Sequence, residues 1–89
     1  IKDSVNYIRM NYSRKISIST LAQYIGLDRS YLCFLFKKYL NMSPQNFLIK
    51  FRMEKACELM KNHELSIGDI ARSVGYEDPL LFSKIFKKI

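Results

Sequence analysis

SISTLAQYIGLDRSYLCFLFKK, residues 17–38, returns later in the same chain as SIGDIARSVGYEDPLLFSKIFKK, residues 66–88. The two stretches align with a shift of 49 residues up to a glycine and of 50 residues beyond it. Eight positions are identical, pairing Ser17 with Ser66, Ile18 with Ile67, Ala22 with Ala71, Gly26 with Gly75, Asp28 with Asp78, Phe36 with Phe86, Lys37 with Lys87 and Lys38 with Lys88. Identities interrupted only at a turn indicate one structural unit used twice.

The unit is typical of a helix-turn-helix. In the first copy Ser19 is predicted to cap a short helix over 20–25, which ends at Gly26 because glycine tolerates the left-handed turn. Asp28 is an N-cap candidate for a longer helix over 29–40, which Asn41 ends. The apolar face of this longer helix is expected to hold Leu32, Leu35, Phe36 and Tyr39.

The second copy repeats these signals. Ser66 is predicted to cap a helix over 67–74, and Gly75 ends that helix. Asp78 followed by Pro79 then starts the last helix, since proline in the first turn loses no needed donor. The paired small residues, Ala22 and Ala71, are expected where the two helices of each unit cross closely.

Two further helices are predicted, one over 2–11 and a long one over 44–62, which Ser43 and Pro44 start. One side of the long helix is apolar and consists of Leu48, Ile49, Met53, Ala56, Cys57, Leu59 and Met60. This arc is wider than one neighbour needs, so we expect the helix to pack against two lobes. The predicted fold is therefore all-α, with helix-turn-helix lobes over 1–43 and 63–89 joined by the helix 44–62.

Arg52 falls inside the apolar arc of the long helix, where a charge needs a partner. We expect an acid such as Asp69, Glu77 or Asp78 to pair with Arg52. A phosphate contact is the alternative.

The charge of the chain points to a polyanionic partner. Its 89 residues carry 15 Lys and Arg against 8 Asp and Glu, a net charge of +7, and the isoelectric point is near 9.6. Residues 1–44 hold 7 basic and 2 acidic side chains, while residues 45–89 hold 8 and 6, so the first lobe should bind phosphate more strongly. The basic residues are dispersed over several helices, which disfavours a membrane-surface helix.

Catalytic and metal chemistry have no visible residues here. The chain holds two cysteines, one histidine and no glycine-rich phosphate loop, so a zinc site, a bound cofactor and an enzyme activity are not expected. Cys33 and Cys57 are predicted to be buried or half-buried thiols in a reducing cytoplasm.

The segments MSPQNFLIKFRMEKACELM, residues 42–60, and SIGDIARSVGYEDPLLFSKIFKK resemble the DNA-binding domain of the AraC/XylS transcriptional regulators. The resemblance covers nearly the whole chain and implies a homeodomain-like pair of helix-turn-helix lobes. It implies a bacterial transcription factor, double-stranded DNA and RNA polymerase as partners, and an effector or dimerisation domain elsewhere in the full-length chain. The family's closing turn and helix are missing after the second repeat, so the second lobe is expected to be truncated.

The resemblance also implies that the helix 29–40 and the helix from 79 onward read bases. Carried over by position, the candidates are Arg29, Ser30, Cys33, Phe34 and Lys37 in the first, and Pro79, Leu80, Leu81, Ser83 and Lys84 in the second. Phe34 departs from a position that often holds a polar or basic reader; it can contact a thymine methyl but carries no hydrogen-bond code. Pro79, Leu80 and Leu81 likewise offer little direct readout, so the second helix is expected to rely on Ser83, Lys84 and groove shape. Burial of Phe34 or Leu81 is the alternative.

The candidates for phosphate contacts are basic or hydroxyl side chains near helix ends: Arg14, Lys15, Ser19, Thr20, Lys37, Lys38, Lys87 and Lys88. The backbone amides of residues 19–21 are expected to add contacts at a helix start. Each lysine has an alternative as a solvated residue that complements a helix C-terminus.

The two helices are expected in major-groove segments one DNA turn, roughly 34 Å, apart. The rival function is a basic protein-interaction module without DNA sequence preference.

Overall fold

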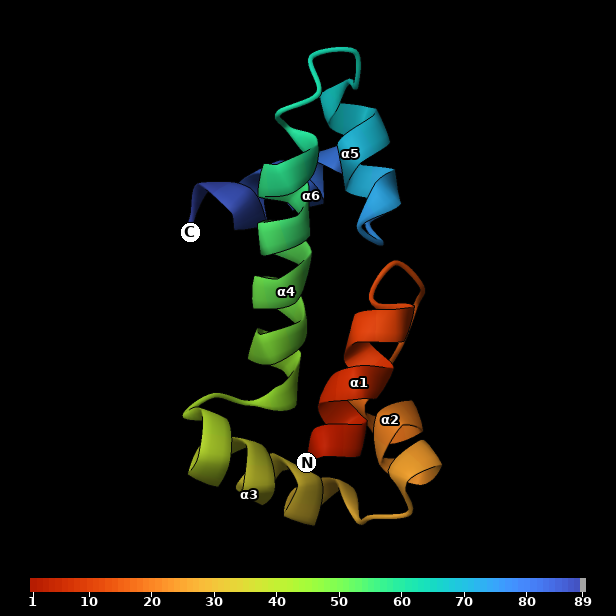
Figure 1. Ribbon diagram of the computed structural model, residues 1–89, viewed down its shortest axis with the longest axis vertical. Helices are drawn as coiled ribbons and strands as arrows, with labels where there is room; N and C mark the ends of the chain where they lie inside the picture. The colour runs from red at the N-terminus through yellow and green to blue at the C-terminus, as the bar shows by residue number, and fades with distance from the viewer. Residues whose placement is uncertain (89) are drawn as a thin grey trace.

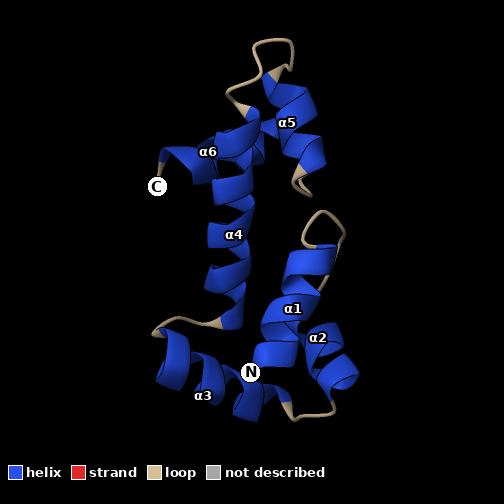
Figure 2. Cartoon of the chain, viewed as in Figure 1, coloured by secondary structure: helices blue, strands red, loops and turns tan. Residues whose placement is uncertain are grey.

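The computed structural model describes residues 1–88 and contains no strand within them (Figures 1 and 2). The helices run in the order α1 (Lys2–Asn11), α2 (Ile18–Ile25), α3 (Arg29–Leu40), α4 (Pro44–Leu59), α5 (Ile67–Ser73) and α6 (Pro79–Lys87). The predicted all-α fold is confirmed. Residue 89, the last of the predicted second lobe, lies outside the described residues.

The caps explain most helix boundaries. The side chain of Ser43 accepts a hydrogen bond from the Asn46 N–H at the start of α4, and that of Asp78 accepts one from the Leu80 N–H at the start of α6. Gly26 and Gly75 both have positive φ, +82° and +104°, so each turn uses the left-handed conformation that the repeat predicted.

Three predicted boundaries are wrong. The helix predicted over 67–74 ends one residue earlier, at Ser73. The cap of α2 is Ser17 and not Ser19, because the Ser17 hydroxyl accepts the Thr20 N–H at 3.0 Å and the helix already begins at Ile18. The long helix ends at Leu59, before the predicted residue 62. Beyond it the backbone bonds tighten to three-residue spacing, with Lys61 N–H bonded to the Glu58 carbonyl, so the α-helix does not continue.

Two separate clusters of buried side chains form the core. The first consists of Ile8, Ile18, Leu21, Ala22, Leu32, Phe36 and Leu48. The second consists of Met53, Ala56, Ile70, Ala71, Val74, Tyr76 and Phe82. Helix α4 supplies residues to both clusters, as its wide apolar arc predicted. The arc is narrower than expected, because Cys57 is exposed and is not the buried or half-buried thiol that we predicted.

Arg52 lies on α4 between the two clusters and is only 8% exposed. Its Nε donates a hydrogen bond to the carbonyl of Tyr12 at 2.8 Å, and its Nη2 donates to the carbonyl of Arg14 at 2.9 Å. The guanidinium carbon also lies 4.9 Å from the centre of the Tyr76 ring. Arg52 therefore links the chain that leaves α1 with the turn that follows α5.

The predicted acidic partner of Arg52 is wrong for all three candidates, since each acid is engaged elsewhere. Asp69 accepts hydrogen bonds from Arg72 and Ser66, Glu77 pairs with Lys15 at 3.2 Å, and Asp78 caps α6. The chain after α1 offers carbonyl oxygens without helical partners, and a guanidinium with five donors satisfies two of them at once.

Ala22→Leu is expected to lower the free energy of unfolding by about 1–3 kcal/mol, because added methylenes overpack a filled core. Ala22 is 3% exposed in the first cluster, on α2 where it packs against α3. Thermal unfolding followed by circular dichroism measures the loss. Gln23→Leu, at the exposed next position, is the control. Equal melting of the two variants would contradict the close helix crossing.

Candidate nucleic-acid interface

Helix α3 is held by one face and presents the other to solvent. Leu32 and Phe36 are fully buried, and they fix the helix against the first cluster. Four of the five predicted base readers on α3 are exposed: Arg29, Ser30, Phe34 and Lys37. Cys33 is half-buried at the edge of the same face and packs against the first cluster. The predicted readers of α3 thus share one side of the helix.

Aromatic side chains occupy the centre of this outward face. Phe34 is 57% exposed, so its predicted alternative, burial, is wrong. The ring of Tyr31 lies nearly parallel to it, with the centroids 6.3 Å apart and an interplanar angle of 15°. The Lys38 ammonium lies 5.9 Å from the centre of the Phe34 ring and 5.5 Å from that of Tyr39. The side chain of Lys38, a predicted phosphate contact, is therefore placed over two rings.

Tyr31 was not among the predicted readers, and Tyr39 was predicted on the buried face of the helix, although Tyr39 is 60% exposed. The three-residue spacing of Tyr31 and Phe34 was the signal that could have found the first ring, since residues at this spacing lie on one helix face. Tyr39 lies near the end of α3. Its side chain is largely exposed, whereas Phe36 on the same helix is fully buried.

The Arg29 side chain reaches from the start of α3 to the start of α2. Arg29 Nη1 lies 3.4 Å from the Ser19 hydroxyl, which joins a predicted base reader to a predicted phosphate contact. The proposed use of the amides of residues 19–21 is wrong for two of them. The N–H of Thr20 is bonded to the Ser17 hydroxyl and that of Leu21 to the Ser17 carbonyl, because the helix begins earlier than predicted.

Helix α6 presents a less polar outward face. Phe82 is buried and holds the helix to the second cluster, while Leu80 and Leu81 are 74% and 48% exposed. The predicted alternative, burial of Leu81, is therefore also wrong. The remaining predicted residues of this helix fall into two groups: Pro79 and Ser83 are half-buried, and Lys84, Lys87 and Lys88 are exposed.

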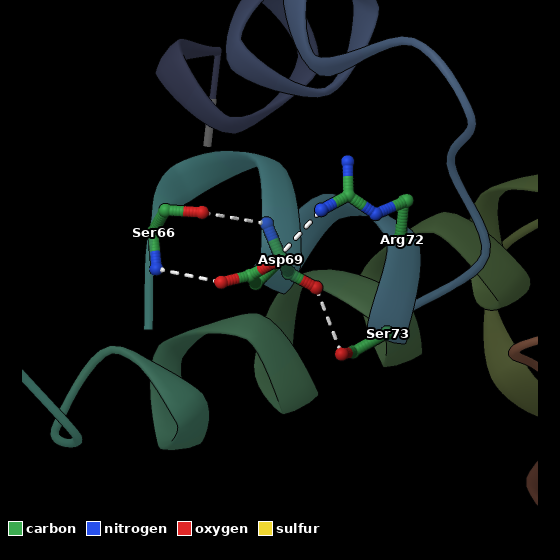
Figure 3. A network of polar contacts seen from close by, with 4 residues as sticks. All are labelled: Ser66, Asp69, Arg72 and Ser73. Atoms are coloured by element: carbon green, nitrogen blue, oxygen red, sulfur yellow. Dashed lines mark hydrogen bonds and ion pairs between the residues drawn. The ribbon is translucent and has the colours of Figure 1, made fainter. Parts of the chain in front are cut away.

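A capping box fixes the start of α5, the helix that packs against α6 (Figure 3). The Ser66 hydroxyl accepts the Asp69 N–H at 3.0 Å, and the Ser66 N–H donates to the Asp69 carboxylate at 3.3 Å. Arg72 Nη2 lies 2.7 Å from the same carboxylate, and Ser73 donates to the Asp69 carbonyl.

Hydrogen bonding to the Ser66 backbone, with further contributions from the Ser66 side chain and Arg72, holds the pKa of Asp69 below its ordinary value. A carboxylate with a lowered pKa stabilises the fold above its ordinary pKa, and this contribution is lost as the pH falls through the lowered value. The capping box therefore weakens only in acid.

Arg14 and Lys15 lie in the exposed segment between α1 and α2. The Lys15 ammonium is 3.2 Å from the Glu77 carboxylate, so this lysine faces the second helix-turn-helix. The pair is largely solvated and contributes little to stability. The Arg14 carbonyl accepts a hydrogen bond from Arg52, while the Arg14 side chain is exposed.

Figure 1 shows α3 and α6 at opposite ends of α4, both running across the long axis of the molecule. The molecule measures 41 × 21 × 20 Å, so its long axis exceeds one turn of B-DNA, about 34 Å. Each of these two helices is buried along one face and exposed along the other. The geometry therefore offers two outward helix faces at the two ends of one elongated body.

Residues 1–88 contain neither a cluster of metal-ligating side chains nor a membrane-spanning helix. No group of three or more His, Cys, Asp or Glu side chains within residues 1–88 is placed to hold a metal ion. Among the described helices, none combines the length and the apolar composition that a membrane crossing needs.

Comparison with known proteins agrees with this geometry. The family described as "Helix-turn-helix domain" matches residues 21–89. The chain is 43% identical over 88 residues to the lactose operon transcription activator of Staphylococcus xylosus and 44% identical over 85 residues to the raffinose operon transcriptional regulatory protein RafR of Pediococcus pentosaceus. These matches cover 99% and 96% of this chain, and 32% and 31% of the two relatives, so the chain spans about a third of their length.

A solved structure carries the same fold. A transcriptional regulator from Chromobacterium violaceum, described as having an AraC-type DNA-binding domain, superposes with a TM-score of 0.89 at 26% identity. The match covers 98% of this chain and 78% of that one. The repeat, the two outward helix faces and these matches together show that the chain belongs to the AraC-type helix-turn-helix domains of bacterial transcription regulators.

Proposed function

We propose that this chain binds double-stranded DNA sequence-specifically and places α3 and α6 in two successive major-groove segments. The observation that carries the proposal is the position of these helices at opposite ends of α4, each with one face buried and the other free (Figure 1). A major groove admits an α-helix, and a net charge of +7 favours a phosphate backbone. Because both units belong to one chain, the two DNA segments need not be palindromic.

We assign the contacts by position and exposure. Base readout falls to exposed or half-buried residues of the two helices, which are Arg29, Ser30, Cys33, Phe34, Lys37, Leu80, Ser83 and Lys84. Phosphate contacts fall to Arg14, Lys15, Ser19, Thr20, Lys37, Lys38, Lys87 and Lys88. The Ser19 hydroxyl and the Arg29 guanidinium lie together at the start of α2, which supports a shared phosphate site there.

The relatives extend the proposal to the whole protein. They are about three times as long as this chain and are named as operon regulators for lactose and raffinose. We therefore propose a cytoplasmic, non-enzymatic activator of an operon for oligosaccharide use, with an effector or dimerisation domain elsewhere in the chain and RNA polymerase as a partner. The division into lobes over 1–43 and 63–89 with a linker helix 44–62 stays a prediction.

Selection from a random duplex library tests the DNA proposal directly. At about 0.15 M salt, near the physiological value, non-specific binding is reduced but not abolished. We expect two conserved blocks about one helical turn apart. A single block would mean that one helix reads bases and the other only holds phosphate. No enrichment by a folded domain would favour the rival function, a basic protein-interaction module.

Replacing both Lys37 and Lys38 with Ala is expected to weaken binding to every duplex and to flatten its salt dependence. Each lost phosphate contact lowers the slope of log K against log salt by about 1, so the pair should lower it by up to about 2. Titrations at several salt concentrations measure the slope. Replacing Lys50 and Lys61 with Ala removes the same charge from exposed positions on and after α4 and is the control. An unchanged slope in the first variant would place both lysines away from phosphate.

A further inference from the structure

Large apolar side chains stand in solvent on both outward helix faces. Phe34 on α3 is 57% exposed, and Leu80 on α6 is 74% exposed. The buried faces of the same helices already hold Phe36 and Phe82 in the two core clusters. The exposed Phe34 and Leu80 therefore have no packing role comparable with that of their buried neighbours, and they occupy predicted base-reading positions.

Each of these apolar side chains is followed on its helix by one or two lysines. Lys37 and Lys38 follow Phe34 on α3, and the Lys38 ammonium lies 5.9 Å from the Phe34 ring. On α6, Lys84 lies one turn beyond Leu80 and is exposed. An apolar side chain next to a positive charge complements a surface where an apolar group lies next to negative charge.

A DNA major groove offers such a surface at thymine. The phosphates line the groove, and the C5-methyl group of thymine is the largest apolar group that a base edge presents there. Phenylalanine and leucine donate and accept no hydrogen bonds, so neither side chain can distinguish bases by their polar edges.

We propose that Phe34 and Leu80 are specificity-determining residues that each contact a thymine methyl group, so that the bound DNA carries a required thymine in both segments. This inference rests on the proposed function and names the class of DNA site. The Tyr31 ring, nearly parallel to Phe34 with centroids 6.3 Å apart, restrains the Phe34 side chain before DNA arrives. Less conformational freedom is then lost on binding.

Replacing single thymines of the selected site by deoxyuridine tests the proposal. Deoxyuridine pairs like thymidine and keeps the O4 acceptor, but it lacks the C5-methyl group. We expect one thymine in each block at which the substitution weakens binding roughly three- to fivefold, the effect of burying one methyl group. Titrations compare the wild type with Phe34→Ala and Leu80→Ala.

The variants assign each methyl group to one side chain. Phe34→Ala is expected to bind the thymine and deoxyuridine forms of the first block equally while still sensing the methyl of the second, and Leu80→Ala the reverse. Tyr39→Ala removes an exposed ring of α3 that is not a predicted reader, and it should keep both sensitivities. A change in DNA shape caused by deoxyuridine would persist in every variant, so the comparison separates shape from contact.

The outcomes separate the two proposals. Sequence-specific binding without thymine in the blocks, or with equal affinity for both forms, would overturn the inference and leave the proposed function standing. Persistence of both sensitivities in Phe34→Ala and Leu80→Ala would also overturn it. Absence of DNA binding by the folded wild-type domain would overturn the proposed function and the inference with it.

Discussion

Arg52→Met is expected to lower the melting temperature by at least about 8 °C. The substitution removes a buried guanidinium that donates to the carbonyls of Tyr12 and Arg14 and contacts the Tyr76 ring. A hydrogen bond that involves a charged group contributes about 1.5–3 kcal/mol, and the partners left behind are unsatisfied. A loss of about 2–4 kcal/mol shifts the midpoint of a domain of this size by about 4–8 °C per kcal/mol.

Thermal unfolding by circular dichroism or calorimetry measures this shift. Lys50→Met removes a charge from the same helix at an exposed position and should melt within a few degrees of the wild type. Arg52→Lys is expected to recover only part of the stability, because a compact ammonium group lacks the planar fork that reaches both carbonyls. If Arg52→Met melted at the wild-type temperature, these contacts would not stabilise the packing of the segment after α1 against the turn after α5.

The same substitution has a consequence for the proposed function. Arg52 connects the segment after α1 with the turn after α5, so it restrains the two helix-turn-helix units relative to each other. At a temperature where Arg52→Met is folded, we expect it to tolerate DNA blocks moved one base pair closer or further apart better than the wild type does. Affinities for duplexes of altered spacing measure this tolerance, and equal spacing profiles would contradict it.

Gly75→Ala is expected to destabilise the domain far more than Gly26→Ala, although the two glycines are equivalent in the repeat. Both have positive φ, which costs a residue with a Cβ about 1–2 kcal/mol. A Cβ at Gly26 would meet no atom within 4 Å. A Cβ at Gly75 would lie 2.7 Å from the Tyr12 carbonyl oxygen and 3.0 Å from Arg52 Cζ.

The Tyr12 carbonyl beside Gly75 cannot move without displacing the end of α1, and moving Arg52 breaks its two hydrogen bonds. Overpacking of this kind adds about 1–3 kcal/mol to the cost of strain. Denaturant titration of both variants gives the two free energies of unfolding. Gly26→Ala serves as the control for strain alone, and equal losses would mean that the close approach at Gly75 relaxes without cost.

Local signals in the sequence predicted the helices well. The caps at Ser43, Ser66 and Asp78 depend on side chains that bond to backbone N–H groups only two or three residues away. The glycine turns depend on the backbone freedom of a single residue. The predicted cap of α2 was wrong because Ser17 and Ser19 are both serines, and serine is a favoured N-cap residue at either position. Only the Thr20 N–H, bonded to the Ser17 hydroxyl, distinguishes them.

The candidate interface was predicted in part. Periodicity placed Leu32 and Phe36 inside and left Arg29, Ser30 and Lys37 on the free side of α3. Whether a large apolar residue is buried depends on which neighbours cover it. The exposure of Phe34, Leu81, Tyr39 and Cys57 was therefore not decided by helix period alone.

By itself the sequence determined an all-helical chain with one helix-turn-helix unit used twice and a long helix between the copies, because helix period, capping and glycine turns act over a few residues. Only the tertiary structure decided how the two units are joined. Arg52 binds backbone carbonyls about 40 residues away in the chain, and no residue type marks a carbonyl as a partner. For the same reason Gly26 and Gly75 are alike in the repeat and differ in the fold, since only Gly75 lies where the two halves meet.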